Sequence, residues 1–161
     1  MTNWLEDLRQ EMADPHEESR RSAQQRVFRA HVEGNVIHLG VPEDPHERSH
    51  IMWAVVESFG TERLLNDMNE RLLKGRGTVT LERDYSSGLD EVFPYAELSW
   101  MDRAEIWSDS YVRVEALPSG EGFALTVNGT ETEPNEGSLK EALKDAFRSP
   151  QRRRRDETWE W

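Results

Sequence analysis

The sequence predicts an α+β fold in which a mostly antiparallel sheet packs against helices. Two regions, about 26–41 and 110–128, alternate between apolar and polar residues around short turn signals, as β-hairpins do. Apolar residues recur every three or four positions near 3–25, 45–74 and 138–148, which is the period of an amphipathic helix. The strands come in runs and do not alternate regularly with helices, so the pattern favours α+β over a doubly wound parallel sheet.

The first hairpin prediction rests on a turn at Gly34-Asn35 and on the register that this turn implies. Folding the chain there pairs Phe28 with Val41 and places the apolar residues of both strands on one face. The agreement between the two strands is the reason for expecting a hairpin here.

The second hairpin is expected to turn at 118–121, which pairs Val114 with Leu125. Two further strands are predicted near 78–84 and 95–100, where apolar and polar residues alternate again. Together these strands would form most of the sheet.

Cap residues locate the helix starts. Asp44 is suited to be an N-cap, with Pro45 at the first helical position. Ser138 and Glu141 have the spacing of a capping box before the last helix. Asn3 is expected to begin the first helix.

The composition fits an acidic protein of 161 residues with a net charge of −12. The absence of cysteine excludes thiol catalysis, disulfides and cysteine-type zinc sites. No apolar run approaches the ~20 residues of a transmembrane helix, and the N-terminal residues lack the basic-then-apolar order of a signal peptide. We therefore expect a cytoplasmic protein without a membrane partner, with one domain over 1–149 and a flexible tail over 150–161.

The acid excess carries a further hypothesis. Only three of the cations are lysines, at Lys74, Lys140 and Lys144. Many acids with few lysines are typical either of halophilic adaptation or of a GC-rich genome, and composition does not separate the two. Under the halophilic hypothesis, stability rises as KCl reaches molar concentration.

One segment has the pattern of a catalytic motif. Residues 46–50 read His-Glu-x-x-His, a spacing that places two imidazoles one turn apart on a helix, where they can share a zinc ion. The segment resembles the zincin metallopeptidases. The resemblance implies that His46, His50 and the downstream Glu70 bind zinc, and that Glu47 activates the metal-bound water.

The same segment also fits an ordinary helix start. Asp44 as N-cap, Pro45 at N1 and Glu47 at N3 satisfy the helix terminus, and the order nearly repeats that of residues 14–17. A helical wheel places the two histidines opposite the apolar stripe, so they are expected to face solvent. Under this reading the protein binds no cofactor, and zinc belongs to the peptidase alternative alone.

The C-terminal tail combines cations with aromatic rings. Its candidate contact residues are Arg152, Arg153, Arg154, Arg155, Trp159 and Trp161. Cations with stacking rings are typical of single-stranded nucleic-acid binding, although the acidic body opposes it. Two other readings remain: a short peptide that docks on a protein partner through its tryptophans, or a terminus that forms salt bridges with the acidic body.

The leading functional hypothesis is a non-enzymatic adaptor that acts through protein–protein interaction. In the order of its helices and strands the chain resembles bacterial secretion chaperones, and this resemblance is one of architecture alone. A homodimer is a further hypothesis, motivated by two separate helical faces. The zinc peptidase is the first alternative, and nucleic-acid contact through the tail is the second.

Overall fold

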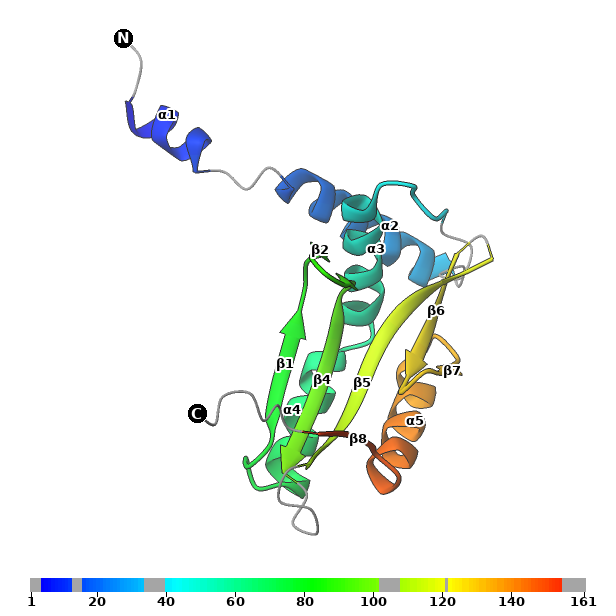
Figure 1. Cartoon of the computed structure of the whole chain (residues 1–161). Helices are drawn as coiled ribbons and strands as arrows, with labels where there is room; N and C mark the ends of the chain where they lie inside the picture. The colour runs from blue at the N-terminus through cyan, green and yellow to red at the C-terminus, as the bar shows by residue number, and fades with distance from the viewer. Residues whose placement is uncertain (1–3, 13–15, 34–39, 102–107, 121, 155–161) are drawn as a thin grey trace.

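The computed structural model of the chain describes residues 4–12, 16–33, 40–101, 108–120 and 122–154. Within them it confirms the α+β class, with helices on one side of a mostly antiparallel sheet (Figure 1). The helices are α1 (Trp4–Glu11), α2 (Glu17–Glu33), α3 (Pro45–Ser58), α4 (Thr61–Leu72) and α5 (Glu136–Arg148). None of these helices is long and apolar enough to cross a membrane.

The main sheet has six strands in the order β1-β4-β5-β6-β7, with β8 paired to β5, and each pair is antiparallel. Its strands are β1 (Thr78–Glu82), β4 (Tyr95–Met101), β5 (Ser108–Ser119), β6 (Gly122–Val127), β7 (Thr130–Thr132) and β8 (Gln151–Arg154). A small second sheet pairs β2 (Ser86–Ser87) with β3 (Glu91–Val92). The short strands β2, β3, β7 and β8 were not predicted, because two to four residues are too few to show a period.

The core lies between the sheet and α3, α4 and α5. Side chains alternate along β4 and β5, so that Leu98, Val112 and Val114 point to the helices and are fully buried. Helix α3 packs on β4, β5 and β6, α4 on β1 and β4, and α5 on β5, β6 and β7. The sheet thus places α4 and α5 on the same face, which sets up the groove described below.

The first predicted hairpin is wrong over residues 26–33, which continue helix α2. The turn and most of the predicted return strand, at 34–39, lie outside the described residues, and the prediction is also wrong at 40–41, which form no strand. Ala23 and Val27 lie one helical turn apart and are buried in the core, and α2 packs on the side of α3 that the sheet does not cover. The burial of apolar residues spaced one helical turn apart therefore outweighed the short apolar–polar alternation that favoured a strand.

The second predicted hairpin is confirmed as β5 and β6, with a register that differs by two residues. Val114 pairs with Val127 instead of Leu125, and Ser119 pairs with Gly122. The turn is therefore a two-residue loop that begins at Gly120, whose φ of +59° suits a tight hairpin turn. A shift of two residues keeps every side chain on its expected face.

The cap predictions have mixed outcomes. Asp44 caps α3 as predicted, and its carboxylate accepts a hydrogen bond from the Glu47 amide at 3.2 Å. The N-cap of α5 is Asn135 and not Ser138, because the Asn135 side chain accepts from the Ser138 amide at 2.7 Å. Helix α5 therefore begins two residues before the predicted start.

Candidate functional site

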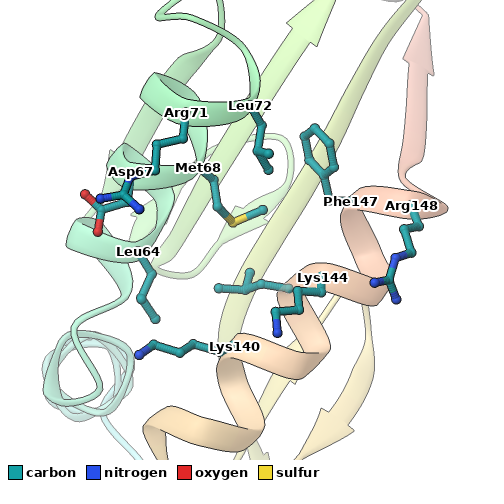
Figure 2. Close-up of a pocket in the computed structure, with 10 residues that line it drawn as sticks. Leu64, Asp67, Met68, Arg71, Leu72, Lys140, Lys144, Phe147 and Arg148 are labelled. Carbon is teal, nitrogen blue, oxygen red and sulfur yellow. The ribbon is translucent and has the colours of Figure 1, made fainter.

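Helices α4 and α5 form the two walls of a groove of about 430 Å³ (Figure 2). Its floor and walls are mostly apolar, whereas cationic groups gather along its rim. The lining residues are Leu64, Asp67, Met68, Arg71, Leu72, Lys140, Leu143, Lys144, Phe147 and Arg148.

The α4 wall is one row of apolar side chains. Leu64, Met68 and Leu72 recur every four residues and so lie along one face of the helix. Leu64 is 7% exposed and Leu72 is 55% exposed, so the row runs from the core out to the open end of the groove. The exposed end is apolar surface that remains in contact with water.

The α5 wall combines an apolar row with a basic row. Leu143 is buried, and the Phe147 ring packs against Trp100 of β4 with 4.9 Å between ring centroids. Lys140, Lys144 and Arg148 recur every four residues beside them. The sheet thus holds the aromatic side chain, while the lysine and arginine heads line the rim.

The charge of this rim is opposite to that of the protein. Four cations and one carboxylate line the groove of a chain whose net charge is −12, and two of the three lysines are among them. Lys140, Lys144 and Arg148 each pair with an acid of the same helix at 3.5, 3.0 and 3.3 Å. These pairs are exposed, and such pairs are weak enough to be exchanged for a ligand carboxylate.

Two of the three acidic partners on α5 line a different surface, whereas Glu136 lies on the α4 side, where it pairs with Arg63. Glu141 and Asp145 line a polar hollow of about 600 Å³ on the β7 side of the helix, together with Glu131. After Glu136, helix α5 therefore has a basic side toward α4 and an acidic side toward β7. This segregation leaves the groove locally cationic.

An ion pair joins the groove walls near their first turns. The Arg63 guanidinium of α4 lies 2.6 Å from the Glu136 carboxylate of α5. Hydrogen bonding to Arg63, with the nearby Lys140 charge, lowers the pKa of Glu136 below its ordinary value. The two residues of the pair are 73 positions apart in sequence.

The other end of α4 is fixed to Gly77, directly before β1. The Asn69 side chain accepts from the Gly77 amide at 2.8 Å and donates to the Gly77 carbonyl at 3.2 Å. A Cβ at Gly77 would lie 2.8 Å from both Asn69 Oδ1 and Leu73 Cδ1, so any larger residue there would have to displace these side chains. The groove wall is held at both ends.

The histidines of the predicted zinc motif lie elsewhere, at the contact between α2 and α3. The His16 and His46 rings stack with 4.9 Å between centroids, and the His50 ring centroid is 5.4 Å from that of His16. Tyr85 meets His46 edge-on at 5.3 Å. The structure thus gathers three imidazoles, one of them from the near-repeat at 14–17.

The prediction that both motif histidines face solvent is wrong for His50, which is 4% exposed. Helix α2 covers it, and Ser19 Oγ lies 2.7 Å from His50 Nδ1. Burial lowers the pKa of His50, and the positive charge of Arg20 lowers that pKa further. His46 itself is exposed, as expected.

The described residues do not form a zinc site of the peptidase type. Glu47 is exposed at the start of α3, and Glu70 is exposed on α4, which packs on β1 and β4. No group of three His, Asp or Glu side chains suited to a metal ion occurs in the described part of the chain. Because a catalytic zinc needs three protein ligands, the arrangement does not fit the ion, and the peptidase stays a prediction from sequence.

Part of the predicted tail is bound to the sheet. Strand β8 pairs with β5, and the Arg153 guanidinium donates to both oxygens of Glu97 at 3.1 Å. Glu97 is 3% exposed and also accepts from Arg113 at 2.9 Å. Arg153 lies over the Tyr111 ring as well, 4.8 Å from its centroid. The salt-bridge reading of the tail therefore holds at Arg153.

The other tail residues have separate outcomes. Arg152 and Arg154 are exposed on β8. Arg155, Trp159 and Trp161 lie outside the described residues, so nucleic-acid or partner contact through them stays a prediction.

The basic row on α5 was not predicted from the sequence, although the spacing of its residues indicates it. Lys140, Lys144 and Arg148 recur at the period of one helix face, and they concentrate lysine in a chain that has few. The groove itself could not be found this way, because its walls come from segments that only the sheet brings together.

Comparison of the chain with protein-family models, with curated proteins and with solved structures gives no significant match. The functional argument therefore rests on the geometry of the groove and on its charges.

Proposed function

We propose that this protein is a non-enzymatic binding protein whose α4–α5 groove accepts an acidic amphipathic helix of a protein partner. One observation carries the proposal: a mostly apolar groove with four rim cations on a chain of net charge −12. An exposed apolar hollow with a charged rim is typical of a recognition surface.

The shape of the groove favours a helical ligand. Its two walls are helices whose lining rows each repeat every four residues, from Leu64 to Leu72 and from Lys140 to Arg148. Each row spans eight residue steps, which is about 12 Å of helix at 1.5 Å per residue. A short amphipathic helix presents anchors at the same repeat and can place them between the two rows.

The charge of the rim favours an acidic ligand. The net charge of the body repels polyanions at long range, so an extended nucleic acid is opposed while a short acidic helix meets only the local rim. Arg71 stands on the α4 side and the basic row on the α5 side, so carboxylates on both edges of a ligand find a partner. Complementary charges of this kind set the orientation of the ligand and speed its association.

The test uses a synthetic helical probe in which leucines recur at i, i+4 and i+8 and glutamates flank them. Fluorescence anisotropy of the labelled probe measures its affinity for the full chain. Reversal of two rim charges, Lys140→Glu with Lys144→Glu, should weaken binding by about tenfold or more. Both side chains are more than half exposed, so the fold should tolerate the change.

Arg21→Glu is the matched control, because Arg21 is an exposed cation on α2 with an acid partner one turn away, Glu17, at 3.2 Å. It changes the net charge in the same sense but leaves the groove intact, so it should bind the probe nearly as the wild type does. A second probe with lysines in place of the glutamates should bind less tightly. Equal binding of the two probes, or equal loss in both variants, would refute the proposal.

A further inference from the structure

The N-terminal helix α1 has an apolar stripe that the body does not cover. Trp4, Leu8 and Met12 are 69%, 42% and 78% exposed. They recur every four residues, and the Met12 amide donates to the Leu8 carbonyl at 3.0 Å, so the stripe continues to the last of them. Figure 1 shows α1 projecting away from the sheet and the other helices.

We propose that α1 of a second copy of this chain occupies the α4–α5 groove, and that two chains exchange their α1 helices in a symmetric dimer. The inference rests on the proposed function of the groove and names its resident ligand. A foreign acidic helix would then bind by displacing α1.

The lengths of the two surfaces agree. The stripe from Trp4 to Met12 spans eight residue steps, or about 12 Å of helix. The apolar row from Leu64 to Leu72 spans the same number of steps on α4. Three apolar anchors of α1 can therefore lie against three apolar residues of α4, with Phe147 on the opposite wall.

The charges of the two surfaces also agree. Helix α1 reads WLEDLRQE, three acids and one arginine, whereas the groove rim has four cations and one acid. At 100° per residue, Asp7 and Arg9 flank opposite edges of the α1 stripe. A docked α1 can place the Asp7 edge toward the basic row of α5 and the Arg9 edge toward Asp67 of α4.

The position of α1 favours a second copy over the same chain. Figure 1 shows α1 projecting beyond the start of α2, whereas α4 and α5, the helices that line the groove, lie toward the other end of the sheet. In a symmetric exchange each chain gives its α1 and receives that of its partner, so the contact forms twice. Doubling the contact doubles the apolar area removed from water.

The experiment measures the mass of the full chain by light scattering at micromolar concentration. The wild type and the Arg21→Glu control should have twice the mass of one chain. Leu8→Asp, which changes an exposed residue of α1, should weaken self-association by about tenfold or more because it places a carboxylate in the apolar contact. Lys140→Glu with Lys144→Glu should do the same from the groove side.

Mixing the two kinds of variant tests the exchange itself. In a pair made of one Leu8→Asp chain and one charge-reversed chain, the unchanged α1 of the second chain can occupy the unchanged groove of the first. One of the two contacts is therefore intact, and the average mass of the mixture should exceed that of either variant alone. A monomeric wild type, an unaffected Leu8→Asp dimer, or a mixture no heavier than its components would overturn the inference.

The leucine–glutamate probe separates this inference from the proposed function. The Leu8→Asp chain has an intact groove without a competing α1, so it should bind the probe at least as tightly as the wild type does. If the probe binds while the wild type is monomeric, the exchange is refuted and the groove keeps its function. If the probe fails to bind the Leu8→Asp chain, both the proposed function of the groove and the exchange of α1 are refuted.

Discussion

The guanidinium of Arg63 lies 2.6 Å from the carboxylate of Glu136, so that α4 and α5 are joined near the beginning of both helices. Both side chains are exposed, and an exposed pair contributes little to the stability of the whole fold. Its position between the groove walls gives it a local effect, because it fixes how far apart the two first turns stand.

We expect Glu136→Gln to weaken binding of the acidic probe while leaving the free energy of unfolding nearly unchanged. The loss of the ion pair lets the two walls separate, and the glutamine cannot hold Arg63 as a charged partner. Glu141→Gln is the control, because that acid pairs within α5 at 3.0 Å from Lys144 and does not bridge the groove. Probe affinities that are equal in the two variants would contradict the role given to the pair.

Alanine substitutions at Gly77 and Gly137 are expected to change the free energy of unfolding in opposite directions. Gly77→Ala should destabilise the protein by about 1–3 kcal/mol, since its Cβ would lie 2.8 Å from Leu73 Cδ1 and 3.0 Å from Leu98 Cδ1. Gly137→Ala, in the first turn of α5, meets only Asn135 Oδ1 at 3.5 Å and should stabilise by up to about 1 kcal/mol. Urea unfolding of both variants measures the difference, and a Gly77→Ala protein as stable as Gly137→Ala would contradict the close packing.

The buried carboxylate of Glu97 is expected to be necessary for the docking of β8. Glu97→Gln should cost about 2–3 kcal/mol, less than the loss at a fully buried pair, because Arg113 and Arg153 are partly exposed. Glu115→Gln is the contrasting variant: burial raises the pKa of Glu115, so removing its charge should cost little or stabilise. Equal unfolding midpoints in urea for the two variants would show that Glu97 does not hold the strand.

The histidine cluster predicts a dependence of stability on pH. Burial, with the charges of Arg20 and His16, lowers the pKa of His50, whereas Asp84 opposes the shift. The folded state therefore favours the neutral ring, so its stability is full above the unfolded pKa of about 6.5 and is lost as the pH falls toward the lowered folded pKa.

We expect the melting temperature of the wild type to fall between pH 7 and pH 5, and His50→Gln to flatten that fall. His46→Gln is the control, because His46 is exposed and its replacement should keep most of the slope. Calorimetric scans across this range measure both. A slope as steep in His50→Gln as in the wild type would exclude His50 as the group responsible.

Local signals predicted most of the fold. The cap at Asp44 and the alternation in β5 and β6 depend on neighbouring residues, so the sequence alone reveals them. Helix α2 did not follow its local pattern, because the burial of Val27 depends on contact with α3. The two-residue error in the β5–β6 register has a similar origin, since both registers keep the same faces and only the turn at Gly120 separates them.

The site was much harder to predict than the fold. The five residues of the zinc motif are adjacent in sequence, yet the structure buries His50 against Ser19, a residue 31 positions away. The groove depends on Leu64 and Phe147, which are distant in sequence and line the same groove only because α4 and α5 lie on one sheet face. The sequence of α5 alone reveals the basic row, but it does not reveal that α4 lies opposite to form the other wall of the groove.

Amide hydrogen exchange of the full-length Leu8→Asp chain, whose groove has no competing α1, with and without the leucine–glutamate probe, tests the central claim most directly. We predict added protection in α4 and α5, over 61–72 and 136–148, with little change in β1 or in α2 near Arg21. Protection at another surface, or none at a probe concentration that saturates the anisotropy signal, would contradict a binding site between these two helices.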